Sequence, residues 1–363
     1  MAWIAIAERG TGLFHPSGVD RLGTAPDDAF APDRLVTRGT ILVETMLSVQ
    51  GRPQTLLAFR HAHPFAGGFS LRALPGGGIV LAQNFGSEMR HATLPHDQDA
   101  RADLVRITYA WDAEAGWGRL ALEHLADGRI FTCGLDRAHA MPLADMRLVA
   151  LSPPMREMDD EVVFAAMADH IHPIGPLPAL AGSVPVATPR GDMAARDLRR
   201  GDPVHTGEDG ITPVLQTTRL TVPARGCFRP VRLRAPFFGL TRDIHVAPHQ
   251  RLIMRGSQVE YMFGTEAVLI PARHLVNQSS AFFCTGMDLV TYHHLLLPGH
   301  TAIMAAGCAV ESLYIGRIRR KPEALAASVL ASCDRARLPE HGKPVWPVLK
   351  PFEAITLATT RAA

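Results

Sequence analysis

The chain has 363 residues, enough for two domains, and 47% of them are hydrophobic, which is ample for two buried cores. Its 31 glycines and 28 prolines are typical of turn-rich β structure rather than helical bundles. The formal net charge is only +2, with both signs interspersed, so nothing indicates a nucleic-acid-binding surface. No apolar run reaches ~18 residues, and we therefore expect no membrane-spanning helix.

The cysteine pattern and the first ten residues indicate in which cellular compartment the protein is expected. The 5 cysteines include no Cys-x-x-Cys pair, a pattern that favours free thiols over a disulfide framework. The first ten residues have no basic leader before their short apolar run, so they do not resemble a cleaved secretory signal. We therefore expect a protein that is cytoplasmic or exported without a cleaved N-terminal signal.

Short apolar segments separated by turn residues follow one another through the first half of the chain, and they predict the strands of an antiparallel sandwich. They are residues 40–47, 54–59, 69–74, 79–83, 104–111, 119–124, 129–133 and 147–151. The part from 36 to 152, above all the strand that ends at Tyr109-Ala110-Trp111-Asp112, is similar to laminin-G or concanavalin-like sandwiches. We place this domain at 1–155. Of its two neighbouring tryptophans, we expect one of Trp111 and Trp117 in the core and the other on a hairpin.

A joining segment follows at 156–178. Residues 161–170 have the composition of a short helix, and residues 172–178 contain three prolines. Proline removes backbone donors and disfavours helix before itself, so this part predicts a stiff extended linker.

Ordered sequence blocks fill the rest of the chain. They are residues 183–191 (Ser-Val-Pro-Val-Ala-Thr-Pro-Arg-Gly), 197–202 (Asp-Leu-Arg-Arg-Gly-Asp), 229–235, 243–252, 268–276, 292–296, 310–313 and, more weakly, 347–354. Together they resemble the Hint (hedgehog/intein) domains of bacteria over about residues 176–357. The resemblance implies a flattened all-β domain, which we place at 179–357, and autoproteolytic processing without a cofactor. The fold class we expect is therefore mostly β, an N-terminal antiparallel sandwich plus a C-terminal Hint-like domain.

The residues that such chemistry requires are replaced here. In a Hint domain a thiol or hydroxyl on the first residue attacks the preceding carbonyl, and a Thr/Ser-x-x-His element polarises the scissile amide and handles the proton of the leaving amine. Laid over the family pattern, the nucleophile position is Ala179, and the hydroxyl and histidine positions are Ala247 and Gln250. His249 lies one residue early, and in an extended strand a shift of one residue turns a side chain to the opposite face. We predict that self-cleavage is lost or severely weakened.

Three readings would rescue the activity. Ser183 could replace the nucleophile, although a turn serine is the simpler interpretation. Cys227-Phe228 imitates the opening dipeptide of the family, but the block at 229–235 follows it at once. His249 could reach the site through a bulge. His249 and His294 are therefore the remaining candidate catalytic residues.

Several histidines need a separate interpretation. His274 and His294 coincide with family positions where a buried, hydrogen-bonded imidazole is the default. His300 follows Pro298-Gly299, a turn, and we expect it to be exposed. Without a His-Glu-x-x-His motif or a cysteine pair, the sequence predicts neither a metal site nor a cofactor.

The N-terminal half has weaker candidates for ligand binding. A loop is flanked by Arg60, His61 and His63. Carboxylates without diagnostic spacing occur at Asp27, Asp28, Asp97 and Asp99.

The sequence therefore predicts a degenerate Hint-domain protein that acts as a structural or binding module. A glycan or a surface protein is the partner class. One alternative is an active autoproteolytic domain with a non-standard nucleophile, and another is a glycan-binding adhesive protein. A metallohydrolase ranks behind both, and the sequence does not indicate an oligomeric state.

Overall fold

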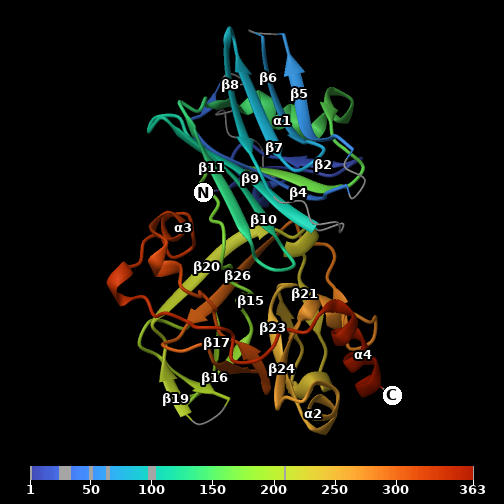
Figure 1. The fold of residues 1–363 in the computed structure, drawn as a ribbon, viewed down its shortest axis with the longest axis vertical. Coiled ribbons are helices and arrows are strands. Elements are labelled where there is room, and N and C mark those ends of the chain that lie inside the picture. The colour runs from blue at the N-terminus through green and yellow to red at the C-terminus, as the bar shows by residue number, and fades with distance from the viewer. Residues whose placement is uncertain are drawn as a thin grey trace. The chain divides into compact units, whose positions relative to one another are not determined.

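The computed structural model describes residues 2–23, 34–48, 52–62, 66–96, 104–207 and 210–362, the last five of these by their backbone. The described chain is mostly β, with several antiparallel sheets, which confirms the expected fold class. It divides into two compact units, Met1–Pro173 and Ile174–Ala363 (Figure 1).

The first unit is a sandwich of two antiparallel sheets. One sheet has the strand order β11 (Ile130–Asp136), β10 (Trp117–His124), β9 (Leu104–Asp112), β4 (Arg38–Met46), β14 (Val162–Ala168), β1 (Trp3–Ala7) and β2 (Gly12–Phe14). The other sheet has the order β13 (Arg156–Glu157), β5 (Gln54–His61), β6 (Gly67–Ala73), β7 (Ile79–Phe85) and β8 (Glu88–Leu94). A two-stranded ribbon joins β3 (Leu35–Val36) to β12 (Met141–Pro142).

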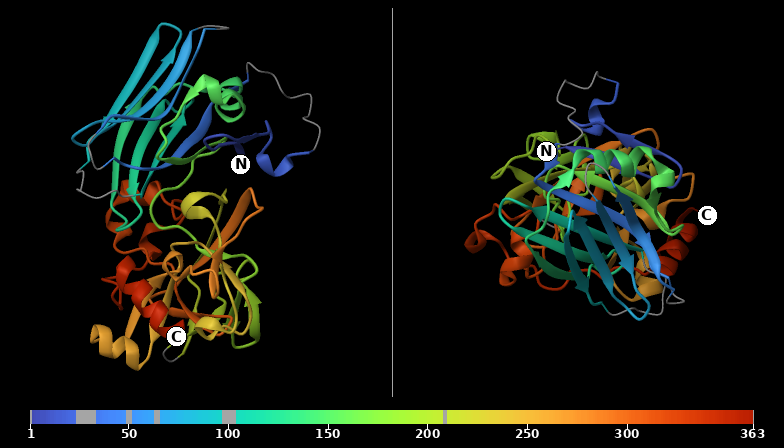
Figure 2. Two further views of the ribbon diagram at one scale, coloured as in Figure 1. Left: turned by 90° about the vertical axis from the view of Figure 1, so that its right-hand side faces the viewer. Right: turned by 90° about the horizontal axis from the view of Figure 1, so that it is seen from above.

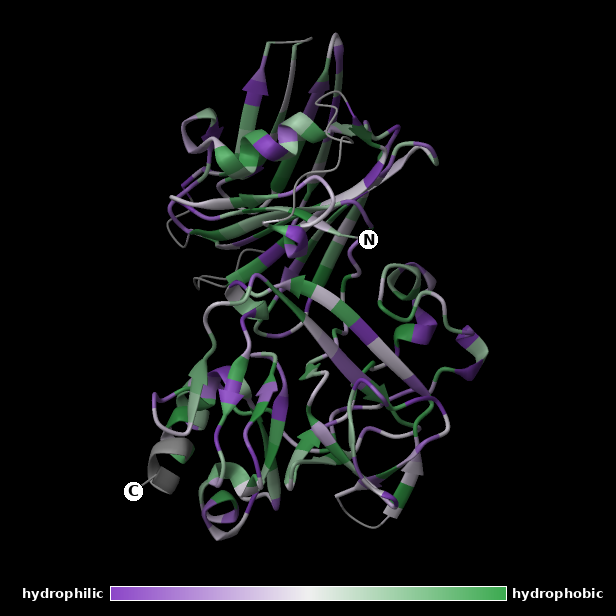
Figure 3. Ribbon diagram, turned by 180° about the vertical axis from the view of Figure 1, so that it is seen from behind, coloured by the Kyte–Doolittle hydropathy of each residue, from purple (hydrophilic) through white to green (hydrophobic). Residues whose placement is uncertain are grey.

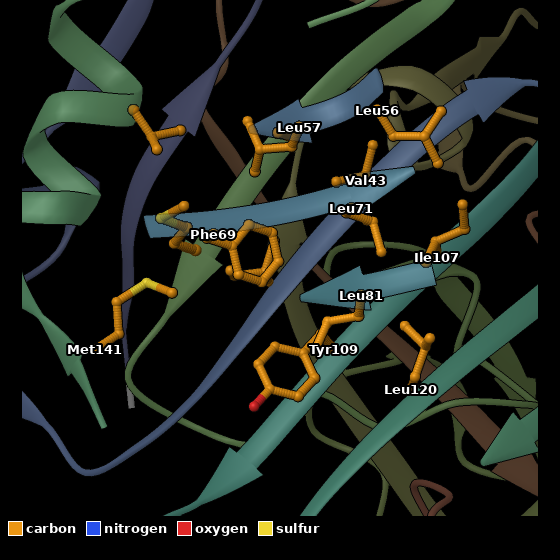
Figure 4. Packing of buried hydrophobic residues seen from close by; sticks show 14 of the residues in the cluster. Val43, Leu56, Leu57, Phe69, Leu71, Leu81, Ile107, Tyr109, Leu120 and Met141 are labelled. Carbon is orange, nitrogen blue, oxygen red and sulfur yellow. The ribbon is translucent and has the colours of Figure 1, made fainter. Parts of the chain in front are cut away.

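Alternating residues of both sheets fill the space between them. Leu57 and Phe69 from one sheet and Val43, Ile107 and Tyr109 from the other belong to one buried cluster (Figure 4). The period of two along each strand is what places these residues on the same side. Trp111 is buried in this cluster and Trp117 is half-buried at the start of a hairpin strand, as the sequence predicted.

The helix expected over 161–170 is wrong. Val162–Ala168 form strand β14, which pairs with β4 on one side and β1 on the other. Its alanines are good helix formers, but such propensities amount to less than about 1 kcal/mol per residue. Pairing along both edges and nearly complete burial of the strand outweigh them.

Helix α1 (Leu143–Leu151) was not expected as a helix, since its apolar residues 147–151 suggested a strand. It packs against β1 and β2 (Figure 2). Arg156 links the C-terminal end of α1 to the residue after β1, because its guanidinium donates to the carbonyls of Val149 and Ala150 and also to that of Glu8. Arg156 itself is only 7% exposed.

The second unit contains two further antiparallel sheets. The first has the order β20 (Gln216–Pro223), β26 (Leu289–Leu296), β15 (Leu180–Ala181), β22 (Ile244–Val246), β21 (Val231–Leu233) and β25 (Ala281–Phe283). The second has the order β17 (Gly191–Ala194), β16 (Pro185–Thr188), β27 (Ala302–Ala305), β28 (Cys308–Glu311), β23 (Arg251–Arg255) and β24 (Ala267–Pro271), with β18 (Pro203–Thr206) on β27 and β19 (Gly210–Pro213) on β18. Hydrophobic and hydrophilic residues are interspersed along these strands (Figure 3).

Helices are few and short in this unit. The α-helices are α2 (Ser257–Phe263), α3 (Pro322–Ala326) and α4 (Pro351–Ala362). The 3-10 helices among the described residues of both units are η1 (Val19–Arg21), η2 (Pro153–Met155), η3 (Gly226–Phe228), η4 (Phe237–Gly239), η5 (Ala272–Leu275), η6 (Ile318–Arg320) and η7 (Arg335–Arg337). Among the described residues, none of the helices is long and apolar enough to cross a membrane.

Candidate functional site

The site expected from the sequence lies around the two-residue strand β15. Leu180 pairs with Val246 of β22 on one side and with His293 of β26 on the other. The carbonyl of Ala179 accepts a hydrogen bond of 2.7 Å from the backbone N–H of Ala247. Ala179, which the sequence predicted at the nucleophile position, is therefore adjacent to Ala247, which it predicted at the hydroxyl position.

Both positions are closed to solvent and carry only methyl groups. Ala179 is 1% exposed and Ala247 is fully buried. Neither side chain has a heteroatom that could attack a carbonyl or donate a proton. The two alanines are therefore hydrogen-bonded neighbours whose side chains offer no reacting group.

Gln250 and His294 meet on one backbone carbonyl. The amide Nε2 of Gln250 donates to the carbonyl of Glu311 at 3.1 Å, and the imidazole Nε2 of His294 donates to the same oxygen at 3.0 Å. Both residues are buried, and burial lowers the pKa of His294 below its usual value, so the ring is neutral near pH 7. With Nε2 carrying the proton, the other ring nitrogen of His294 is an acceptor.

One buried acceptor atom of each of these two side chains lacks a hydrogen-bond partner among the described residues. They are Oε1 of Gln250 and Nδ1 of His294. A buried polar atom in this state usually marks a bound water or a changed site. The resemblance to Hint domains implies a hydroxyl at position 247, where this chain has Ala247, and a hydroxyl is a donor of the kind that such acceptors need.

The carboxylate of Glu311 accepts hydrogen bonds from an imidazole and from a guanidinium. Its Oε1 accepts from Nε2 of His300 at 2.8 Å and from Nη1 of Arg251 at 2.9 Å. Burial by itself raises the pKa of Glu311, but the hydrogen bond from His300 and the charge of Arg251 outweigh it and hold the pKa below its usual value. Glu311 therefore fixes the carbonyl that Gln250 and His294 share.

Sequence reasoning missed this network and misplaced His300. His300 is 8% exposed rather than exposed, because Glu311 and the rings of Tyr314 and Trp346 surround it. A charged residue inside the apolar block 310–313 was the available signal for Glu311.

His249 does not lie in an extended strand. Residues 247–250 form a turn between β22 and β23, closed by a bond of 2.9 Å from the N–H of Gln250 to the carbonyl of Ala247. The argument that a one-residue shift reverses the face therefore does not apply here. The turn leaves His249 half-buried and brings Gln250 inward beside His294. A catalytic role for His249 or His294 stays a prediction.

The other candidates are two nucleophiles and His274, which is half-buried rather than buried as expected. Ser183 is exposed in the turn after β15, in line with the turn-serine interpretation. Cys227 is half-buried in η3. Burial and the charge of Arg273 lower the pKa of His274 to about 4, and Nε of Arg273 donates to Nε2 of His274 at 3.3 Å.

In the first unit, His61 lies 3.3 Å from the carboxylate of Asp145. Burial raises the pKa of Asp145 to about 6, and the neighbouring His61 opposes that shift. The remaining loop candidates, His63, Asp27, Asp28, Asp97 and Asp99, lie outside the described residues. Within the described ranges, no group of three or more His, Cys, Asp and Glu residues could hold a metal ion.

Residues 178–317 match the family model of the Hint domain. Among solved structures, the chain is similar to the CBM40 of Ruminococcus gnavus IT-sialidase bound to α2,3-sialyllactose, with 16% identity, coverage of 36% of this chain and 62% of that one, and a TM-score of 0.24. It thus spans less than two thirds of that structure.

A bacterial intein-like domain from Clostridium thermocellum is similar at 11% identity, with 38% of this chain and 99% of that chain covered and a TM-score of 0.26. Comparison with curated proteins finds no match. The assignment rests on the family match together with the geometry around Ala179. The chain therefore carries a Hint domain, a domain of the autoprocessing type, joined to an antiparallel β-sandwich.

Proposed function

We propose that the Hint domain of this chain does not cleave itself and acts as a structural or binding module attached to the sandwich. The observation that supports the proposal is that Ala179 and Ala247 are buried, hydrogen-bonded neighbours. In the family pattern these two positions carry the nucleophile and the hydroxyl. Conversion of an amide to an ester or thioester needs a heteroatom on the first residue of the domain, and a methyl group supplies none.

The proton transfer is blocked as well. Gln250 occupies the histidine position, and a carboxamide neither gains nor loses a proton near neutral pH. His294 is neutral and its Nε2–H is already committed to the carbonyl of Glu311. A nucleophile introduced at position 179 would therefore have neither Gln250 nor His294 as an acid for the leaving amine.

For the partner of the module we propose a glycan or a surface protein. The support is the sequence similarity of residues 36–152 to laminin-G and concanavalin-like sandwiches, an argument from fold class alone. Retention of the intact chain on a panel of immobilised oligosaccharides, compared with a chain heated above its unfolding transition, tests this part separately.

Intact mass spectrometry tests the loss of self-cleavage. Freshly purified protein and protein kept for a day with excess dithiothreitol or hydroxylamine should both give one mass near 39.4 kDa. Fragments that separate near residue 178 would refute the proposal. In that case, Ser183→Ala and Cys227→Ala variants would identify the nucleophile.

A further inference from the structure

A cavity of about 160 Å³ opens in the second unit, and its lining includes none of the residues of the candidate site. It lies where the start of β20 and the end of β26 meet the turn before β18 and the segment around η7. A cavity of about 150 Å³ accommodates one six-membered ring, whereas whole drug-sized ligands need about 300–1,000 Å³. This cavity therefore admits one ring-sized group.

Polar side chains dominate the accessible part of the lining. Leu296 and Leu338 belong to a buried hydrophobic cluster and are 0% and 4% exposed, so they offer a ligand little surface. The polar lining residues are exposed or half-buried: Arg200, Gln216, Ser332, Cys333, Asp334 and Arg337. A ligand must therefore satisfy charged and hydrogen-bonding groups rather than fill an apolar pocket.

Two arginines supply positive charge at the cavity. Arg200 is exposed, and no carboxylate pairs with it within the described ranges. Burial raises the pKa of the Cys333 thiol and the charge of Arg200 opposes this rise, as expected for a guanidinium near that thiol. Nε of Arg337 lies 3.3 Å from Oδ2 of Asp334, in a pair whose side chains are 69% and 58% exposed. Both guanidinium groups can therefore donate to an anionic group of a ligand.

The carboxylate of Asp334 disfavours a simple anion in the same cavity. Its Oδ1 accepts from the backbone N–H of Ala336 at 3.0 Å, and a carboxylate can accept further hydrogen bonds. A ligand that carried only negative charge would be repelled by it, whereas a hydroxyl would donate to it. The carboxamide of Gln216 and the hydroxyl of Ser332 are further partners for hydroxyl groups.

These requirements together describe an acidic sugar, because a hexuronic acid is a six-membered ring with one carboxylate and several hydroxyl groups. We propose that the cavity binds one hexuronic acid residue of an acidic glycan, with its carboxylate at Arg200 and Arg337. Its hydroxyl groups lie at Gln216, Ser332 and Asp334. The inference rests on the glycan-binding part of the proposed function, and it names the class of sugar and the place of binding.

The first test is calorimetric titration of the full chain with D-glucuronate. A ligand of this size, at the efficiency usual for small ligands, corresponds to a dissociation constant of about 1 mM. Glucose lacks the carboxylate, and acetate and L-glutamate lack the ring hydroxyls. We therefore expect each of these three to bind at least roughly tenfold more weakly than glucuronate.

Cys333 reports occupancy of the cavity in the unaltered protein. At about 10 mM glucuronate, mass action leaves roughly one site in ten empty, so alkylation of Cys333 by iodoacetamide should slow about tenfold. Cys284 is also half-buried but does not line the cavity, and its alkylation rate should not change. Peptide mass spectrometry measures the two rates separately, and this readout does not depend on how a variant folds.

The variants Arg200→Gln and Arg337→Gln should each weaken glucuronate binding about tenfold. The matched control is Arg242→Gln, because Arg242 also pairs with an exposed aspartate, Asp192, at 3.3 Å, and this variant should bind like the unaltered protein. Retention of neutral oligosaccharides without binding of glucuronate would overturn the inference and leave the proposed function intact, whereas the failure of every glycan would overturn both. Equal binding of acetate or L-glutamate, an unchanged alkylation rate of Cys333, or equal weakening by all three variants would also overturn the inference.

Discussion

Glu311 offers the sharpest test of how the Hint site is held. In Glu311→Ala the side chain that accepts from His300 and Arg251 is lost, while the backbone carbonyl that holds Gln250 and His294 remains. Each charge-assisted hydrogen bond contributes about 1.5–3 kcal/mol, and breaking a buried pair costs about 3–5 kcal/mol. The side chain of Arg251 is 30% exposed and regains water, so we expect a loss near the middle of that range, about 4 kcal/mol.

Urea unfolding, followed by Trp346 fluorescence, measures this loss. The ring of Trp346 lies 6.4 Å from that of His300, close to the perturbed network. For an m-value of about 2 kcal/mol/M, the unfolding midpoint of the second unit should fall by about 2 M. Glu311→Gln retains an acceptor and should lose about half as much.

The matched control is Glu340→Ala, which removes a half-buried surface carboxylate that pairs with the exposed side chains of Arg319 and Arg320, and it should change the midpoint by much less. A fall of less than roughly 0.5 M for Glu311→Ala would show that the network does not stabilise the unit as argued.

The pKa of Glu311 is lowered in the folded state, so below about pH 4.5, the ordinary value, the unfolded chain takes up the proton first. The stabilisation should therefore be complete above that pH and decline below it, and Glu311→Ala should lack this decline.

Three further outcomes concern other parts of the chain. Arg156→Met should lower the free energy of unfolding of the first unit by about 2–4 kcal/mol, because the carbonyls of Val149, Ala150 and Glu8 lose their donor. Urea unfolding measures the loss, and a change under about 1 kcal/mol would contradict this role. Gly39→Ala should lower the melting temperature of the same unit, since a Cβ there would lie 2.5 Å from the ring of Trp111, and an unchanged melting temperature would refute the steric argument. Burial keeps His172 and His294 neutral with lowered pKa values, so the unfolded chain gains protons first below pH 6.5. The melting temperature should therefore fall as the pH is lowered from 7 to 5, and it should fall less in the variant His172→Phe.

The strand pattern of the sandwich was accessible to sequence reasoning because its signal is local. In residues 104–111 apolar side chains recur at every second position, and the same period appears in β9, whose Val105, Ile107, Tyr109 and Trp111 are all in the core. Turn residues mark where such strands stop. The Hint blocks are local in the same sense, and their order along the chain sufficed to predict the Hint domain that residues 178–317 match. The assignment of the site positions to Ala179, Ala247 and Gln250 stays a prediction.

Contacts between distant residues decided the rest. Residues 162–168 have helical composition and become a strand because β1 and β4 lie on either side of them. His300 follows a turn in the sequence but is buried because Glu311 and Trp346 reach it.

The C-terminal residues are also placed by contacts with distant parts of the chain. Beyond the family match that ends at residue 317, Leu349, Ala354 and Leu357 complete the core of the second unit. The sequence by itself determined most of the strands of the sandwich and the order of the Hint blocks, since both are properties of short segments, but it misjudged residues 162–168 and 147–151. Only the tertiary structure decided which buried polar groups are satisfied and where a cavity opens, because these depend on packing between segments far apart in the chain.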